Sequence, residues 1–257
     1  MIGILQVSYL RGANKMLKIT IPPNLNSARQ YILNVLLTEF IGISFTTEIK
    51  NVNTLQIFYE NKTLTIADTF FQQAANHWLQ PESLPLLPLA QWNVSEDITD
   101  VNLVSNSVPV IFGDEVYLKS HDNGLHLGLD IFGSAFFMLS RYEEAVKSER
   151  DIHDRFPASA SLAYQADFLH RPIVNEYVEI LWACMKQLWP QLERKPRNSR
   201  ILVSHDVDNP FEYSFFSPSR LLKRMAGDIL KRHSLVKAAK SLSGWIKVKT
   251  SGLSCTK

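Results

Sequence analysis

The segment Pro190 to Ser199 (PQLERKPRNS) divides the chain and so limits what it can fold into. It is polar and basic, contains two prolines, and follows an apolar helical pattern that ends at Leu188. This composition is typical of a linker between domains. We therefore expect one domain at residues 16–198 and a second region at 199–257. Because 46% of the 257 residues are hydrophobic, the first domain can bury a sizeable core.

The patterns before Pro190 predict a small sheet and several helices. LKITI, at 17–21, alternates as a half-buried strand does. From Asn26 or Ser27 to about Phe40, apolar residues recur at helical spacing, and Gly42 is a natural stop. Further patterns predict strands from Ile43 and Leu55, a hairpin of Val108–Gly113 with Glu115–Ser120 turning at Gly113-Asp114, and helices over 130–146 and 173–188. The predicted fold class is α/β, with a mixed α/β domain first.

Charge is distributed unevenly along the chain. Residues 220–257 contain ten Lys or Arg against one acid, Asp228, whereas the remainder has 17 basic and 24 acidic residues. A basic tail is typical of nucleic-acid or anionic membrane binding. This tail lacks interleaved aromatic residues and a nucleic-acid motif, so we expect no nucleic-acid partner. A solvated or partner-covered helical surface is the plainer interpretation.

The sequence also bears on the compartment. Its two cysteines, Cys184 and Cys255, make a disulfide framework improbable. The apolar start lacks the basic region of a signal peptide, and no apolar run reaches the roughly 18 residues of a membrane span. We expect a cytoplasmic protein without a transmembrane segment, and Met16 is a plausible true start.

A possible reactive pair follows the linker. Ile201 to Val203 predict a short buried parallel strand, and Asp206 and Asp208 come where it would end. Two residues apart, both carboxylates would point to the same side. A cation beside them would relieve their repulsion, so that one could bind a metal and the other act as general base. Alternatively, the pair caps a helix or stabilises a turn at Asn209-Pro210.

A second polar group precedes the linker. It comprises Arg141, Glu143, Glu144, Asp151, His153, Asp154 and Arg155. Carboxylates and a histidine together can bind a metal, but this spacing fits no metal template. Arg–carboxylate pairs that hold a loop to a helix are the favoured interpretation.

Several motifs together resemble a known family. The strand with SHDVD is similar to the first motif of polysaccharide deacetylases of the NodB-homology, carbohydrate esterase 4 type. GLDIFGSAFFMLSRYEE (128–144), DRFPASASLAY (154–164) and LHRPIVNEYVEILW (169–182) resemble the uncharacterised domain that precedes some of these enzymes. The resemblance implies an accessory domain at 16–198 and the start of a distorted (β/α) barrel at 199–257. It also implies Asp206 as base, Asp208 as ligand of a divalent metal such as zinc, and an acetylated polysaccharide as substrate.

The chain departs from that family at the metal site. Its deacetylases use two histidines four residues apart, whereas His233 is the one histidine after Asp208 and has Ile229 and Lys237 at those distances. We therefore expect a truncated deacetylase without turnover of its own and without a tightly bound metal. The alternative is a non-catalytic binding or assembly module, with an acidic α/β domain and a basic helical tail. The polymer and the oligomeric state stay open.

Overall fold

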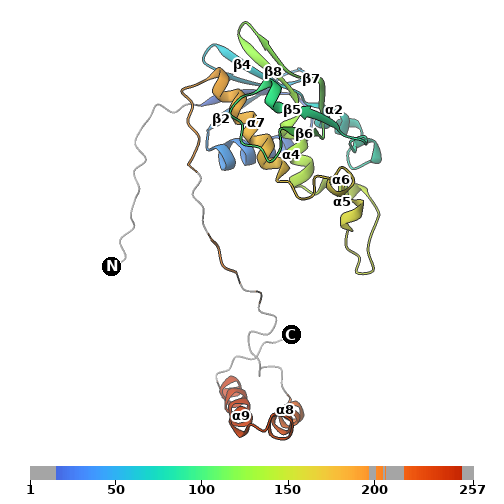
Figure 1. The fold of residues 1–257 in the computed structure, drawn as a ribbon, viewed down its shortest axis with the longest axis vertical. Coiled ribbons are helices and arrows are strands. Elements are labelled where there is room, and N and C mark those ends of the chain that lie inside the picture. Colours follow the sequence, from blue (N-terminus) through green and yellow to red (C-terminus); the bar gives the residue numbers. More distant parts are fainter. Residues whose placement is uncertain (1–15, 197–200, 205, 207–216, 251–257) are drawn as a thin grey trace, which may run out of the picture. The chain divides into compact units, whose positions relative to one another are not determined.

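The computed structural model describes residues 16–196, 201–204, 206 and 217–250 (Figure 1). The chain divides into two compact units, at residues 1–197 and 198–257. The first unit contains sheets and helices, and the elements described in the second are helices.

The first unit is built on a mixed sheet of six strands. In the described residues, the first unit as a whole has the strands β1 (Leu17–Ile21), β2 (Phe45–Ile49), β3 (Leu55–Tyr59), β4 (Lys62–Ile66), β5 (Ala90–Asn93), β6 (Ser107–Val110), β7 (Gly113–His121) and β8 (Gly124–Leu129). The large sheet has the order β2-β1-β3-β4-β8-β7, and β5 pairs with β6 separately. The pairs β1/β2 and β4/β8 are parallel, and the other neighbours are antiparallel.

The strands of each parallel pair are connected by long segments that contain helices, because parallel strands cannot be joined by tight turns. The helical elements are α1 (Asn26–Leu33), the π-helix η1 (Asn34–Ile41), α2 (Thr69–Asn76), η2 (Pro81–Ser83), α3 (Val94–Asp97), α4 (Ile131–Leu139), α5 (Tyr142–Val146), η3 (Ala158–Ala160), α6 (Leu162–Gln165) and α7 (Ile173–Leu188). The longest of these, α7, packs against β4, β8, η1 and α4, and α4 also packs against α1 (Figure 1).

The core lies between this helical layer and one face of the sheet. Alternate residues of each inner strand point into it, among them Ile19, Ile57, Leu64 and Leu127, which are all buried. Burying each such side chain stabilises the fold by about 1.5–3 kcal/mol. The alternating partners, such as exposed Lys18, face the other side of the sheet.

Polar contacts attach α7 to the sheets. The Tyr177 hydroxyl donates to the Pro109 carbonyl at 2.5 Å and accepts from the Ile111 N–H at 3.3 Å. At the end of the helix, the Trp189 indole N–H donates to the Tyr59 carbonyl at 2.9 Å. Since these partners lie in or beside β6 and β3, α7 holds the small sheet to the large one.

Several elements agree with the sequence predictions. The strand at 17–21 and the helix at 173–188 are confirmed. The helix that begins at Asn26 is also confirmed, but it continues as a π-helix to Ile41. Gly42 then ends it with φ 86°, a conformation that glycine adopts without the steric cost of a side chain.

The predicted hairpin with a turn at Gly113-Asp114 is wrong. Instead β6 pairs with β5, β7 pairs with β8, and the chain turns at Asp122-Asn123. Gly113 serves a close approach of strands, because a Cβ there would lie 2.5 Å from the Gly128 carbonyl oxygen. The helix predicted over 130–146 is also interrupted, at Arg141 with φ 55°.

The second unit consists, in its described residues, of exposed chain and two helices that pack against each other. These are α8 (Pro218–Leu230) and α9 (Leu235–Thr250). Ile201, Leu202 and Val203 are 93%, 76% and 76% exposed and form no strand, so the buried strand predicted there is wrong. A barrel strand requires a paired neighbour on each side, and the described residues of this unit supply none. The mixed α/β fold is thus shown for the first unit, and the barrel segment is not.

We predict that Tyr177→Phe destabilises the first unit by about 1–3 kcal/mol, because it leaves the buried Pro109 carbonyl and Ile111 N–H without their hydroxyl partner. Urea unfolding measures this change. Tyr164→Phe is the matched control, since Tyr164 is 57% exposed, and it should leave the midpoint unchanged. Equal midpoints for both variants would show that the hydroxyl does not stabilise the contact.

Candidate functional site

The predicted catalytic pair cannot be assembled from the described residues. Asp206 is exposed and outside regular secondary structure, and Asp208 lies outside the described residues. In the part of the chain that the structure describes, no group of three or more His, Cys, Asp and Glu is placed to hold a metal ion. The roles predicted for Asp206 and Asp208, and the zinc that they would bind, stay predictions.

The polar group at 141–155 forms local pairs. Arg141 pairs with Glu144 at 2.5 Å, and Arg155 with Asp151 at 2.8 Å, which holds the pKa of Asp151 below its usual range. Buried Glu143 accepts from the Leu162 N–H at 2.8 Å and from Lys147. Both Arg–carboxylate pairs join residues only three or four positions apart, so neither holds the loop to a helix in the way that the sequence predicted. Glu143 instead connects α5 to the start of α6.

A buried polar cluster lies at the carboxyl ends of β4 and β8. Asp68 follows β4 and precedes α2, and Asp130 follows β8 and precedes α4. The two strands are parallel neighbours, so their carboxyl ends meet at the same edge of the sheet. Reactive groups often collect at such an edge, which makes this cluster a candidate site.

Every charged group of the cluster is bonded within the protein. Both terminal nitrogens of Arg29 donate to the Asp68 carboxylate, one of them at 2.7 Å, and its guanidinium lies 4.5 Å from the centroid of the Phe71 ring. The Asp130 carboxyl accepts from the N–H groups of Phe70 and Gly133, both at 2.8 Å. One carboxyl thereby joins the first turns of α2 and α4.

Burial dominates the electrostatics of the cluster. Burial, and after it the negative charge of Asp68, raises the pKa of Asp130 to about 8. Burial also raises the pKa of Asp68, against the opposing effect of Arg29. With Asp68 4% and Asp130 1% exposed, no ligand reaches either carboxyl. We conclude that the cluster is structural.

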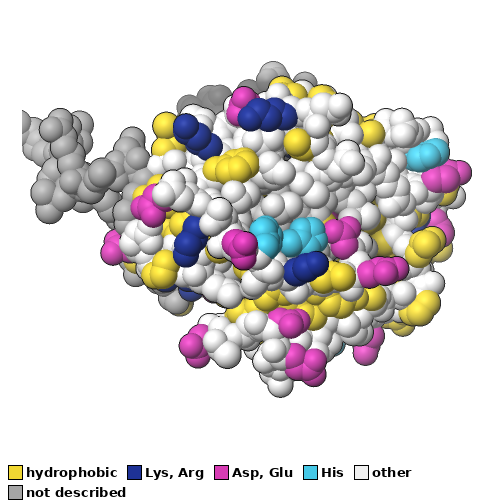
Figure 2. All heavy atoms as spheres, turned by 90° about the horizontal axis from the view of Figure 1, so that it is seen from above, with side chains coloured by type: hydrophobic (Ala, Val, Ile, Leu, Met, Phe, Trp, Pro, Cys, Tyr) yellow, Lys and Arg dark blue, Asp and Glu magenta, His cyan; other side chains and the backbone are white. Residues whose placement is uncertain are grey.

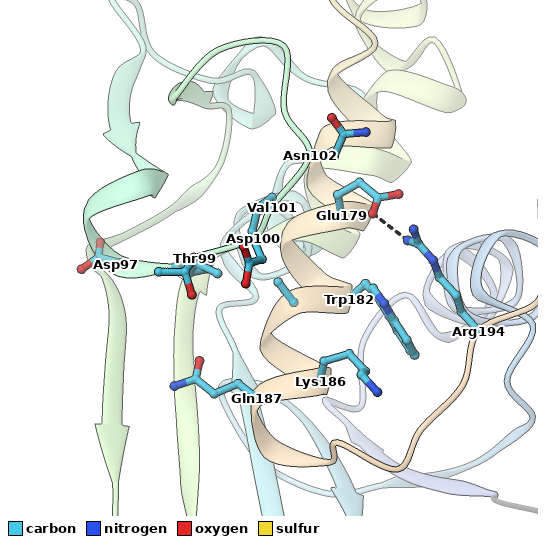
Figure 3. Close-up of a pocket in the computed structure, with 12 residues that line it drawn as sticks. Asp97, Thr99, Asp100, Val101, Asn102, Glu179, Trp182, Lys186, Gln187 and Arg194 are labelled. Carbon is cyan, nitrogen blue, oxygen red and sulfur yellow. Dashed lines mark hydrogen bonds and ion pairs between the residues drawn. The ribbon is translucent and has the colours of Figure 1, made fainter.

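An open groove of about 670 Å³ lies over the outer face of α7 (Figure 3). Its floor includes the small side chain of Ala183. The loop from Asp97 to Asn102 borders it on one side and Trp182 with Arg194 on the other (Figure 3). A groove of this size that combines an aromatic ring with a few polar groups is typical of a small-molecule site.

The wall with Trp182 is held in place by its neighbours. Arg194 donates to Glu179 at 2.6 Å, and its guanidinium lies 5.7 Å from the centroid of the Trp182 ring. Lys186 lies 5.9 Å from that ring and donates to the Leu192 carbonyl at 3.1 Å. The segment after α7 is therefore folded back along the helix, with the half-buried indole beside it.

The opposite wall supplies groups for hydrogen bonds. Thr99, Asp100 and Asn102 are exposed there, and Gln187 projects from α7. Asp97 accepts from the Trp92 indole N–H at 2.7 Å, which fixes one end of the wall. Acids and bases nearly balance around the groove, with three carboxylates against Lys186 and Arg194. Acidic and basic side chains are also interspersed on the face of the protein seen in Figure 2.

The comparisons with known proteins give one match. The model of a family described as "Family of unknown function (DUF7033)" matches residues 17–190. Neither a curated protein nor a solved structure matches the chain.

This match corrects the resemblance stated above. The family found is not a polysaccharide deacetylase or NodB family, so the identification as a truncated deacetylase is wrong. The motifs at 128–144, 154–164 and 169–182 lie within the matched region and form α4, α5, α6 and most of α7. Their aromatic residues Phe132, Phe137 and Tyr142 are buried and fill the core.

The groove was not predicted from the sequence. A signal was present, because Trp182 lies out of phase with the buried stripe of α7, which contains Tyr177, Leu181, Cys184 and Leu188. The other wall comes from a loop some eighty residues earlier in the chain, and no pattern in the sequence relates the two.

We predict that Arg29→Met destabilises the first unit by about 3–5 kcal/mol, because it leaves the buried Asp68 carboxylate without its counter-charge. Arg141→Met is the control, since that arginine forms an exposed ion pair of about 0–1 kcal/mol. Urea unfolding of both variants checks this. If the free energy of unfolding fell equally in both variants, the buried Arg29–Asp68 pair would stabilise the fold no more than an exposed pair does.

We also predict that stability falls as pH rises from about 4 to about 8. The pKa of Asp130 is 3.8 in its ordinary environment and about 8 in the fold, so in this window the unfolded chain binds fewer protons than the folded one. The free energy of unfolding therefore decreases with pH, by up to about 1.4 kcal/mol per pH unit for one proton. Asp130→Asn should flatten this slope between pH 5 and 7.5. Parallel slopes for the two proteins would contradict the assignment to Asp130.

Proposed function

Because the chain belongs to the DUF7033 family, whose function is unknown, we propose from its geometry that it is a non-catalytic binding module whose first unit binds a neutral saccharide. The groove over α7 carries this proposal. The sequence raised the alternative of a non-catalytic binding or assembly module with an acidic α/β domain. The saccharide partner and its place of contact are proposed from the geometry of the groove.

Three properties of the groove favour a saccharide. The indole of Trp182 can stack on the C–H face of a sugar ring. Hydrogen-bond donors and acceptors are supplied by Thr99, Asn102 and Gln187, and further acceptors by Asp100. Sugar hydroxyls both donate and accept hydrogen bonds, so they can bind to this mixture of groups. The near balance of charge favours a neutral ligand over a strongly charged one.

The proposed function requires no metal. Asp206 and Asp208 have no part in it, and the groove belongs wholly to the first unit. The module would bring a polymer to a partner, in the cytoplasm if the compartment expected from the sequence is correct.

We predict that the full chain binds neutral oligosaccharides of the chitin type and that Trp182→Ala lowers the affinity about tenfold, because it removes the stacking surface. Titration calorimetry measures both proteins, and Trp182→Phe should restore part of the affinity. Tyr164→Ala removes an exposed aromatic ring outside the groove and should change nothing. Binding that is unaffected by Trp182→Ala, or acetate release from these oligomers with added zinc, would contradict the proposal.

A further inference from the structure

The helical hairpin of the second unit, α8 with α9, has a very small interior. Leu221, Asp228, Ala238 and Ser241 are its buried residues among those described. The Asp228 carboxylate accepts from Arg232 at 2.7 Å and from the Ser241 hydroxyl at 3.3 Å, which links the two helices. So small an interior leaves most apolar side chains of the hairpin at its surface.

Those apolar side chains are ordered along one side of each helix. In α8 they occur at i, i+4, i+7 and i+8, and in α9 at i, i+4, i+7 and i+11, spacings that place residues on one helical face. The two apolar stripes are Leu222, Ala226, Ile229 and Leu230 in α8, and Leu235, Ala239, Leu242 and Ile246 in α9. The larger members are 40–73% exposed. Apolar area of this extent on a surface indicates an interaction site.

Cations surround the apolar stripes. Residues 217–247 contain eight Lys or Arg and one acid, and that acid is the buried Asp228. In α9, Lys237, Lys240 and Lys247 lie on a different side of the helix from the stripe that begins at Leu235, as their spacing requires. A helix with apolar residues on one side and Lys or Arg on the other is typical of helices that lie at an anionic membrane surface.

We propose that the α8–α9 hairpin binds the surface of a bilayer that contains anionic phospholipid. The apolar stripes enter the boundary of the acyl chains, and the cations contact the phosphate groups. An anionic bilayer can bind both the apolar stripes, through its acyl chains, and the cations, through its phosphate groups. A nucleic acid would use the cations but not the exposed leucines, and a symmetric dimer through the stripes would bring two strongly positive units together. No helix among the described residues is long and apolar enough to span a membrane.

The first test uses the full chain and vesicle flotation. We expect binding to vesicles of phosphatidylglycerol with phosphatidylcholine, no binding to phosphatidylcholine alone, and release at high salt. Lys237→Gln with Lys240→Gln should lower the partition coefficient about twenty-fivefold, from about fivefold for each cation removed. Lys62→Gln with Lys119→Gln makes the same charge change in the first unit and should have no effect.

The second test concerns the apolar stripes. Leu230→Gln with Leu235→Gln should abolish binding while the helical circular-dichroism signal is kept, because both side chains are more than 70% exposed. Leu86→Gln with Ile152→Gln is the control, at exposed apolar residues of the first unit. Trp182→Ala should bind vesicles normally, which separates this site from the saccharide groove.

Three outcomes would overturn the proposal. One is equal binding to neutral and anionic vesicles, which would assign the contact to hydrophobicity alone. Another is high affinity for duplex DNA or RNA without vesicle binding. The third is a stable dimer, seen by light scattering and lost in the leucine variant, that does not bind vesicles.

Discussion

The first unit depends on one buried interaction, the contact of Arg29 with Asp68 beside Asp130. It joins α1 to the residue before α2, and the Asp130 carboxyl joins the first turns of α2 and α4, at the edge where β4 and β8 end. Polar and charged side chains away from water are tolerated only when each is hydrogen-bonded or paired, and Arg29, Asp68 and Asp130 all are. Removing any of these side chains leaves a buried polar group without its partner. The structure of this edge therefore depends on specific hydrogen bonds and an ion pair as well as on apolar packing. It is closed to ligands for the same reason.

The groove lies over the outer face of α7. The inner face of the same helix forms part of the core through Tyr177, Leu181 and Met185. A helix held on one side by the core and at its end by Trp189 is a rigid base for Trp182. The return segment adds Arg194, which fixes Glu179 and lies near the indole. The groove is thus formed by elements whose positions are already determined.

The two proposed sites use different physics. The groove combines a stacking surface with nearly balanced charge, which suits selection among neutral ligands. The α8–α9 hairpin has an excess of one charge and exposed apolar stripes, which suits attachment to an extended anionic surface with little selection. A module that binds a polymer at one site and a membrane surface at the other would bring the two together.

The sequence alone determined the elements whose patterns are local. The strand at 17–21, the helix from Asn26, the stop at Gly42 and the helix at 173–188 each follow from periodicity or from backbone freedom, which depend on neighbouring residues. The basic character of residues 220–257 also follows directly from the amino-acid composition. Tertiary structure decided the rest, because strand pairing, burial and grooves depend on residues far apart in the chain. Gly113 lies close against Gly128, and Ile201 to Val203 form no strand because no strand of the described residues pairs with them. Trp182 comes to line the same groove as Asp100 and Asn102 only in the folded first unit.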